Sequence, residues 1–437
     1  MRPIPNKGLS GALGSVETIR RDELTCCSHW PHAFASERKD YRYYEIVEDT
    51  IFQGFDYRYF AIKDPSGQVC AVQPFFILDQ DLLVGAVAKI GKLIEFIRTI
   101  WPRFMRLRVL MVGCAAGEGH LDDPNVMPAW LQSQLLASAI VKEARAMNVS
   151  LIVLKEFPAK YRDILQCFLR RGFTRVPSLP MTKLNIDYSS FAEYMNKALN
   201  SATRTKLRKK FRAAAQAAPI EMSVVEDITP IVDEIYPLYL QVYERSKLHF
   251  EKLSRAYFCR LGRLMPDKVR FFIWRQNERV VAFTLCMIQR EAIYAEYIGL
   301  DYSVALDLHL YHYAVRDMIT WSIANGYKWF RSSSLNYDPK LHLRHLLDPI
   351  DLYVRHVSRA KNVVLKFVLP LIEPTRYDKT LQKFPNYQEL WAASPRWAPR
   401  RSNNFLPKQT QYDIEPIISN SWWVSVNTLR IIGKTNA

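Results

Sequence analysis

Paired cysteines, a secretory leader and long apolar runs are all absent from this chain of 437 residues. Its seven cysteines are an odd number, none belongs to a C-x-x-C pair, and no histidine accompanies them at a metal-ligand spacing. No apolar stretch follows Met1–Pro5, and no uninterrupted apolar run reaches the roughly 18 residues that a membrane-spanning helix needs. We therefore expect a cytoplasmic protein without disulfides, a bound metal or a membrane span.

Acidic residues are also in short supply. The chain has 60 lysines and arginines against 43 aspartates and glutamates, a formal charge of +17 at pH 7. This excess predicts contact with something anionic, either nucleic acid, a lipid surface or a phosphate-rich cofactor or substrate. The 13% aromatic content argues against disorder for the body of the chain.

One pattern of strand, turn, strand, long helix and strand occurs twice. In the first copy these segments are Phe60–Lys63, Val69–Leu78, Pro128–Met147 and Leu151–Leu154. In the second copy they are Phe271–Trp274, Val280–Ile288, His309–Ala324 and Tyr327–Phe330. A duplicated unit predicts two copies of one small α/β domain with mixed sheets and a cleft between or within them.

The duplication divides the chain into four parts. Residues 1–40 have no periodicity and are expected to form a weakly ordered tail. Residues 41–187 form the first domain and residues 188–360 the second. Residues 361–437 are expected to form a helix, interrupted at prolines, and a largely disordered tail.

An insertion in the first domain, residues 85–108, has apolar residues at helical spacing and a basic polar face. Lys89, Lys92 and Arg98 lie on it, and a tryptophan stands near its end. Such a helix is able to lie on an anionic membrane, at the inner face if the protein is cytoplasmic. The alternative is an ordinary helix packed on its own domain.

A basic helix is predicted between the domains. Ser190 followed by Glu193 forms a capping box, which marks the start of a helix. The helix continues into a run of cations with no acid at i±4: Arg204, Lys206, Arg208, Lys209, Lys210 and Arg212. This run is either a phosphate-binding patch for a cofactor, a lipid head group or RNA, or a solvated helix face.

Glu296 lies in an apolar strand, on the same face as Tyr294 and Ile298. A buried carboxylate has a raised pKa and is able to take a proton from an incoming amine, which predicts a general base. The alternative is a structural glutamate paired with an arginine.

The segment after the second long helix turns abruptly polar, as active-site loops do. Ser332, Ser334 and Asn336 are potential hydrogen-bond donors there, and no G-x-S-x-G elbow surrounds the serines, which argues against a serine hydrolase. Tyr337 is predicted to protonate a leaving group and Lys340 to hold an anionic group, unless Asn-Tyr-Asp-Pro is only a turn. The histidine pairs nearby, His309 with His312 and His342 with His345, lack the acidic or thiol ligand that would complete a metal site.

The basic connector, the strand pair 271–288, the strand with Glu296 and the closing Tyr337–Leu343 together resemble the GNAT superfamily. Within it the chain is similar to tandem GNAT proteins of the Fem-like branch, which add amino acids to peptidoglycan, and to BioF2-like acetyltransferases. The resemblance is strongest over residues 190–357 and is limited to order and spacing over residues 41–187. It implies two GNAT-like domains in tandem, joined by a basic helix.

The resemblance implies an N-acyltransferase that uses acyl-CoA, most simply acetyl-CoA, and no metal. The acceptor would be an amine of a sugar, lipid or amino acid, in cell-envelope or polysaccharide synthesis. Glu296, Tyr337 and Ser334 are then the expected catalytic residues, with backbone amides near Ile298 and Gly299 at the oxyanion. Arg204, Lys206 and Arg208 are expected at the cofactor phosphates. Lys340, Asn336 and Tyr294 are expected at the substrate.

The turn before the second long helix, residues 300–307, departs from the family because it has no glycine and carries two acids. Pyrophosphate binding at that helix N-terminus is therefore in question. Two alternatives stay open. One is a Fem-like transfer from aminoacyl-tRNA to a peptidoglycan precursor, and the other is a non-catalytic scaffold that binds membrane or nucleic acid.

Overall fold

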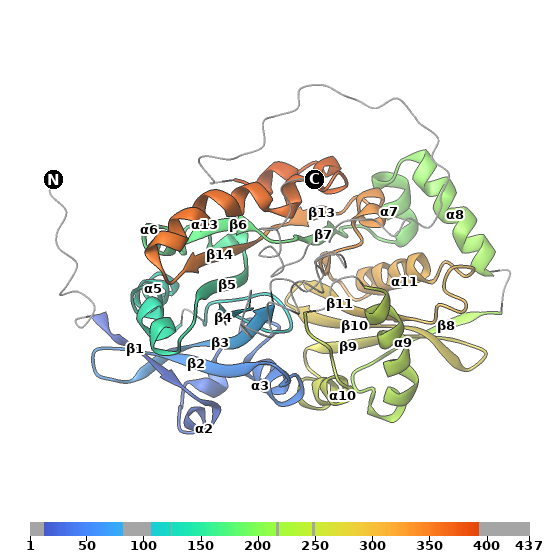
Figure 1. The fold of residues 1–437 in the computed structure, drawn as a ribbon. Helices are drawn as coiled ribbons and strands as arrows, with labels where there is room; N and C mark the ends of the chain where they lie inside the picture. Colours follow the sequence, from blue (N-terminus) through green and yellow to red (C-terminus); the bar gives the residue numbers. More distant parts are fainter. Residues whose placement is uncertain (1–12, 82–105, 124, 216–217, 247–249, 393–437) are drawn as a thin grey trace, which may run out of the picture.

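The computed structural model describes residues 13–81, 106–123, 125–215, 218–246 and 250–392. Two seven-stranded mixed sheets lie side by side, each with helices on both faces (Figure 1). The insertion predicted over 85–108 lies outside the described residues as far as residue 105, and from Arg106 onward it belongs to a strand. The predicted tail beyond residue 392 also lies outside them.

The first sheet has the strand order β1-β2-β3-β4-β5-β14-β6. Its strands are β1 Ser15–Ile19, β2 Asp56–Lys63, β3 Val69–Asp81, β4 Arg106–Val112, β5 Leu151–Pro158, β14 Ile350–His356 and β6 Thr174–Pro177. Strands β1 to β4 form an antiparallel meander, and β4 and β5 are parallel. Helix α5 (Ala129–Ala146) makes the crossover that a parallel pair requires.

The second sheet has the corresponding order, β8-β9-β10-β11-β12-β7-β13. Its strands are β8 Ile220–Val225, β9 Val269–Gln276, β10 Arg279–Gln289, β11 Ala292–Leu300, β12 Trp329–Ser332, β7 Met181–Asn185 and β13 Leu346–Asp348. Strands β8 to β11 form the meander, β11 and β12 are parallel, and helix α11 (Leu310–Ala324) crosses between them. The predicted duplication and the predicted fold class are confirmed.

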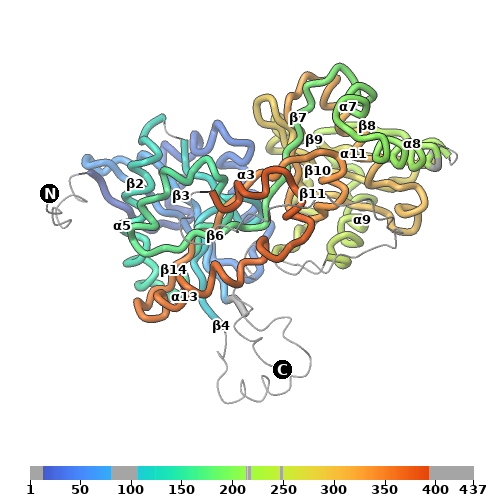
Figure 2. Tube along the Cα trace, turned by 90° about the horizontal axis from the view of Figure 1, so that it is seen from above, coloured from blue at the N-terminus to red at the C-terminus, as the bar shows by residue number. Residues whose placement is uncertain are grey.

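The two sheets exchange strands. Strand β7 follows β6 closely in the chain but pairs with β12 of the second sheet, and β14 follows β13 but pairs with β5 of the first. Figure 2 shows the orange end of the chain returning to the first half. The predicted boundaries at residues 187 and 360 therefore do not separate two self-contained sheets, because each sheet needs a strand from the other half.

The N-terminal segment is ordered from Leu13 onward, contrary to the predicted loose tail. It forms β1 at the edge of the first sheet, helix α2 (Arg21–Leu24) and the 3-10 turn η1 (Trp30–His32). Asp40 then caps helix α3 (Tyr41–Thr50) by accepting a bond from the Arg42 amide. Trp30 and Phe34 are buried in the core, which explains why a segment without periodicity is fixed in place.

The remaining helices cover the sheets. They are α6 Gln166–Arg170, α7 Phe191–Ala198, α8 Ser201–Ala215, α9 Val232–Arg245, α10 Arg255–Leu264, α12 Tyr337–His342 and α13 Arg359–Ile372. Ser190 caps α7 as predicted, with its Oγ accepting from the Glu193 amide at 3.1 Å. Glu193 itself accepts from the amide and hydroxyl of Ser189, so the capping box closes one residue early.

A single hydrophobic cluster joins the two halves. Phe76 and Met111 of the first sheet belong to it together with Phe283 of the second sheet and Phe258 of the helix α10 that covers it. Helices α3 and α10 pack on each other at this junction. One hydrophobic core therefore spans the two halves.

Candidate functional site

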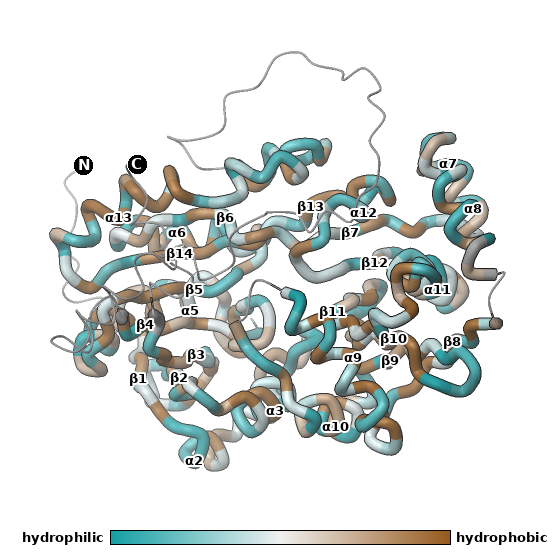
Figure 3. Tube along the Cα trace, turned by 45° about the vertical axis from the view of Figure 1, so that its right-hand side comes forward, coloured by the Kyte–Doolittle hydropathy of each residue, from teal (hydrophilic) through white to brown (hydrophobic). Residues whose placement is uncertain are grey.

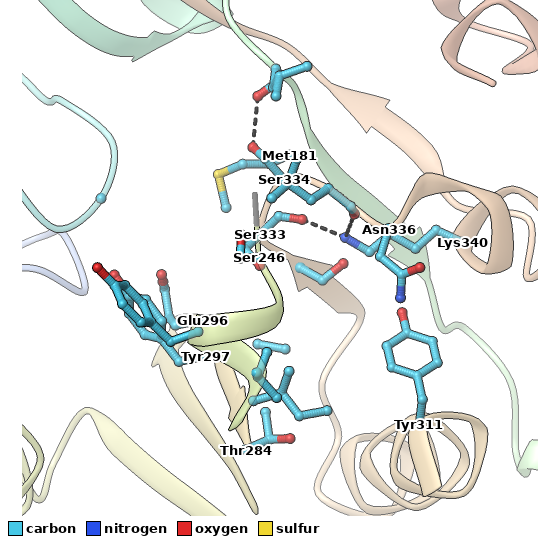
Figure 4. A pocket seen from close by; sticks show the side chains of 18 of the residues that line it. Met181, Ser246, Thr284, Glu296, Tyr297, Tyr311, Ser333, Ser334, Asn336 and Lys340 are labelled. Atoms are coloured by element: carbon cyan, nitrogen blue, oxygen red, sulfur yellow. Dashed lines mark hydrogen bonds between the residues drawn. The ribbon is translucent and has the colours of Figure 1, made fainter. Parts of the chain in front are cut away.

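A cavity of about 640 Å³ opens where two parallel strands of the second sheet diverge. Strands β11 and β12 are paired from Ala292 and Trp329 up to Ala295 and Ser332, where β12 ends. In the described part of the chain, β11 continues to Leu300 without a strand neighbour on that side. The segment after β12 leads away from it, and the space between the two is the cavity (Figure 4).

Both halves of the chain line this cavity. The first half contributes Gly117, Glu118, Lys155, Glu156, Leu179 and Met181. The second contributes polar groups that include Thr284, Glu296, Ser334, Asn336, Lys340 and His345. The predicted cleft is thus present, and Glu296 and Lys340 share it.

Glu296 is held in a buried ion cluster. Its carboxylate accepts from Arg38 Nε at 2.7 Å and lies 3.1 Å from Lys39 Nζ. The same two cations pair with Glu118 of the first half. Although burial opposes it, Arg38 and Lys39 hold the pKa of Glu118 well below its usual range.

This pairing favours the structural interpretation of Glu296. The side chain is 8% exposed, and both carboxylate oxygens already bind cations. The carboxylate supplies the counter-charge for two buried cations, which is a structural task that would be lost with it. Glu296 instead connects the N-terminal segment to the second sheet. Tyr294, expected at the substrate, lies under the Arg38 guanidinium, whose carbon is 3.7 Å from the ring centroid, and supports the same cluster.

Lys340 has no carboxylate partner in the described part of the chain. It is buried on α12, and its Nζ donates to the carbonyl oxygens of Ser333 at 2.5 Å and Leu335 at 2.8 Å. Burial lowers the pKa of Lys340 to about 7. These bonds use two of its hydrogens, so one position on Nζ is left for a ligand. That position is an N–H donor when the amine is charged and a lone pair when it is neutral.

The loop that Lys340 holds is in an unusual conformation. Leu335 and Asn336 both have left-handed backbones, with φ of 75° and 50°. Such consecutive non-glycine residues cost energy and persist where contacts impose them, often at binding sites. The Asn336 side chain points toward the hydroxyl of Tyr311 from α11, and both residues line the cavity (Figure 4).

His345 lies beside Lys340 in the same wall. It is 2% exposed, and neither ring nitrogen has a partner within the described residues. Burial and the neighbouring Lys340 lower the pKa of His345 to about 3, so the ring is neutral. A ligand that enters this part of the cavity therefore finds an unused neutral donor and acceptor.

Several predicted site residues are not brought to the cavity in the expected role. The Tyr337 hydroxyl donates to the Pro180 carbonyl at 2.9 Å, burial raises its pKa, and the residue does not line the cavity, so it has no free proton there. Ser334 does line the cavity, but its hydroxyl donates to the Leu179 carbonyl at 2.7 Å. Ile298 lines the cavity, whereas Gly299 faces α9 so closely that a Cβ would lie 2.8 Å from the Tyr239 amide nitrogen.

The predicted phosphate cations lie apart from Lys340. Arg204 turns back to the carbonyl of Leu199 at 2.6 Å, and Lys206 and Arg208 are exposed on α8, outside the cavity lining. Helix α8 does adjoin α11, since Lys210 Nζ lies 2.9 Å from the His312 ring. A basic surface and the cavity are therefore neighbours and not one site.

The turn before α11 is occupied by its own acid. Asp301 is buried, its Oδ1 accepts from the Ser303 amide at 3.0 Å, and it pairs with Arg279. His309, the residue before α11, has a left-handed φ of 51°. An anion bound there would be repelled by the Asp301 carboxylate, and the Ser303 amide would not be free to bind it because it already donates to Asp301. Both facts argue against the usual binding of a pyrophosphate at this helix N-terminus.

Sequence reasoning missed the cations of the first half that line or support the cavity. Arg38 and Lys39 stand in a segment without periodicity, and Lys155 lies within β5, after four buried apolar residues. Nothing in their local sequence indicates burial. The sequence contains one indirect signal. Burying the Glu296 carboxylate costs free energy unless a cation such as an arginine pairs with it.

Two kinds of feature are absent from the described residues. No group of three or more histidine, cysteine, aspartate or glutamate side chains there is placed to hold a metal ion. Within the same residues, no helix combines the length and the apolar character that crossing a bilayer requires.

The chain forms two interlocked halves, each built on a mixed sheet of the same strand order, with a cavity that both halves line. Residues 127–334 match the sequence model of a FemAB-like family, described as peptidoglycan biosynthesis/recognition. This match spans the end of the first half and most of the second, and it confirms the resemblance to the Fem-like branch. A comparison with curated proteins found no match.

Solved structures that resemble this chain include three with informative names. FemX is 12% identical, with 71% of this chain and 90% of that one covered and a TM-score of 0.43. A tandem GNAT protein from the clavulanic acid biosynthesis pathway is 10% identical, with 79% and 99% covered and a TM-score of 0.43. L-PGS from Bacillus licheniformis is 10% identical, with 60% and 84% covered and a TM-score of 0.41.

Proposed function

We propose that the protein is a transferase that moves an acyl or aminoacyl group onto an amine of a peptidoglycan or other cell-envelope precursor. The FemAB-like match supports the reaction class and the acceptor. The observation that carries the proposal is Lys340, a lysine without a carboxylate partner in the described residues, in the wall of a cavity that both halves line.

In this proposal Lys340 stabilises the transition state. The amine nitrogen forms a bond to the carbonyl carbon of the donor, and the oxyanion that develops accepts a hydrogen bond from the third N–H of the Lys340 ammonium. The bond to the leaving sulfur or oxygen then breaks, and the proton lost by the amine passes to solvent or to the leaving group. The two carbonyls that hold Nζ keep the donor aimed before the substrate arrives.

The donor is proposed to be acyl-CoA, as expected from the sequence, or an aminoacyl ester of tRNA. The buried Asp301 in the turn before α11 argues against acyl-CoA bound through its pyrophosphate at the N-terminus of that helix. The exposed cations of α8, next to α11 and without an acidic partner in the described residues, favour the second, because phosphate contacts dominate nucleic-acid affinity.

A transfer assay with mass detection of the modified acceptor tests the proposal. Acetyl-CoA, longer acyl-CoA thioesters and aminoacyl-tRNA are offered in turn, with amine-bearing peptidoglycan precursors. Lys340→Gln is expected to lower kcat by about a hundredfold, the loss typical of one oxyanion donor. Lys183→Gln, a half-buried lysine paired with Asp348 outside the cavity lining, is the matched control and should keep its activity. Full activity in Lys340→Gln would refute the proposed role.

Two binding measurements distinguish acyl-CoA from aminoacyl-tRNA as the donor. A donor that binds only the native protein raises its melting temperature, so thermal shift with free CoA and acyl-CoA tests the first candidate. A gel shift with tRNA at two salt concentrations tests the second, and its affinity should fall steeply with salt. Lys206→Glu with Arg208→Glu should abolish the tRNA shift and leave any CoA-dependent stabilisation unchanged.

A further inference from the structure

Helix α13 carries apolar residues on its outer face as well as on its inner face. Its inner face, with Leu365 and Leu369, packs on the first sheet, and Asn362 fixes it by donating to the Gly172 carbonyl at 2.9 Å. Its outer face carries Val363, Val364, Phe367 and Leu371, which are 55%, 60%, 60% and 46% exposed. Figure 3 shows α13 at an outer edge of the molecule with hydrophobic segments along it.

The exposed apolar residues form one stripe. Val363, Phe367 and Leu371 are spaced at i, i+4 and i+8, so they stand above one another on a single helix face, with Val364 beside them. An ordinary surface helix presents charged residues at this position. Exposed apolar residues grouped in this way mark an interaction surface, whereas single ones do not.

Only cations accompany the stripe. Arg359 and Lys366 stand on one side of it and Lys361 on the other, all exposed. The helix has no acid, and Glu373 just after it is buried and bonded to Thr375. An apolar stripe flanked on both sides by cations is the pattern of a helix that lies in the surface of an anionic bilayer.

A cluster of arginines adjoins the start of α13. Arg355, at the end of β14, has its pKa lowered by burial and by repulsion from Arg145, Arg359 and Arg171. Within the described residues these four arginines form no salt bridge, and Arg355 Nε is buried without a hydrogen-bond partner. Unneutralised cations at the end of the apolar stripe are placed to meet phosphate head groups when the stripe enters the bilayer.

We propose that the outer face of α13 docks the protein on an anionic phospholipid bilayer, with Val363, Val364, Phe367 and Leu371 in the acyl boundary and Arg359, Lys361 and Lys366 at the phosphates. This surface differs from the predicted insertion at 85–108. It also lies outside the cavity lining, so it does not depend on the proposed transfer reaction.

Vesicle co-sedimentation of the full chain tests the docking. Vesicles of equal parts phosphatidylglycerol and phosphatidylcholine should bind the protein, and pure phosphatidylcholine should bind it much less. The double variant Val363→Ser with Phe367→Ser should bind the mixed vesicles at least about tenfold more weakly, because the apolar area it inserts is lost. Arg359→Gln and Lys366→Gln should each weaken binding about fivefold.

Phe52→Ser is the matched control, since Phe52 is 62% exposed at the end of α3 in another part of the molecule. It should bind like the unmodified protein, and all variants should show unchanged melting curves because the substituted side chains are exposed. Equal binding by the Val363→Ser, Phe367→Ser double variant, or no binding of the unmodified chain to mixed vesicles, would overturn the proposal. Self-association that the double variant abolishes, without vesicle binding, would overturn it in favour of a second copy of the chain.

Discussion

Lys340 makes a specific prediction about how stability depends on pH. Its pKa is about 7 in the folded protein and 10.5 without burial. Between these values the unfolded chain keeps a proton that the folded protein has released. Raising the pH through this window removes that proton from the unfolded chain, so the free energy of unfolding should rise by about 1.4 kcal/mol per pH unit, or about 5 kcal/mol in all.

The variant Lys340→Met removes this dependence. It also leaves the carbonyls of Ser333 and Leu335 without their donor, which costs about 1–3 kcal/mol for each buried group. The two effects oppose each other at neutral pH, so the absolute stability of the variant is a poor test. The informative quantity is the difference between the unmodified protein and Lys340→Met as the pH rises.

Urea unfolding at several pH values between 7 and 10.5 measures that difference. The unmodified protein should gain stability relative to Lys340→Met with the slope given above, and Lys142→Met, at an exposed lysine of α5, should follow the unmodified protein. A difference that stays constant with pH would refute the conclusion that Lys340 is buried without a counter-charge. Transfer activity should be lost in Lys340→Met even where its stability is equal, which separates the catalytic role from a structural one.

Four further predictions follow from individual groups. If the charged form of Lys340 acts, kcat should fall as the pH rises through about 7, and a rising limb there would identify the neutral amine as a base instead. Glu296→Gln should lower the free energy of unfolding by about 3–5 kcal/mol in urea titrations, because it leaves Arg38 and Lys39 under-compensated; a loss of activity without a loss of stability would restore the general-base hypothesis. Burial raises the pKa of Glu373 to about 8, so the folded protein retains a proton between pH 4.5 and 8 that the unfolded chain loses. Melting temperatures should therefore decrease with rising pH in this window, less so in Glu373→Gln, and equal slopes would contradict the assignment. Gly117→Ala should destabilise by about 1–3 kcal/mol more than Gly54→Ala, since both have positive φ but only at Gly117 would a Cβ meet a neighbour, 2.2 Å from Lys39 Nζ.

The duplicated topology could be predicted from the sequence because its signals are local. Strands β9 and β10 are apolar runs with a short turn between them, and the long helical patterns of α5 and α11 end at Asn148 and Asn325. The exchanged strands could not be predicted in the same way. Strands β7 and β14 have five and seven residues, and which sheet each joins depends on packing over long distances and not on its local pattern.

The candidate site was predictable in position and not in detail. Polarity after a buried strand correctly indicated the cavity wall around Ser334, Asn336 and Lys340. The partner of Glu296 is 258 residues away in the sequence, so no local pattern could identify it. Whether Lys340 anchors a phosphate or stands alone in an apolar wall depends on burial, which the sequence of a turn does not express.

The exchange of β7 and β14 has a consequence for how the two halves are related. Cutting the chain between residues 187 and 188 would leave one fragment without the strand beside β5 and the other without the strand beside β12. Neither fragment then has a complete sheet, and expression of either alone should yield aggregation through the bare sheet edge. Because residues from both halves line the cavity, its full wall also requires the intact chain.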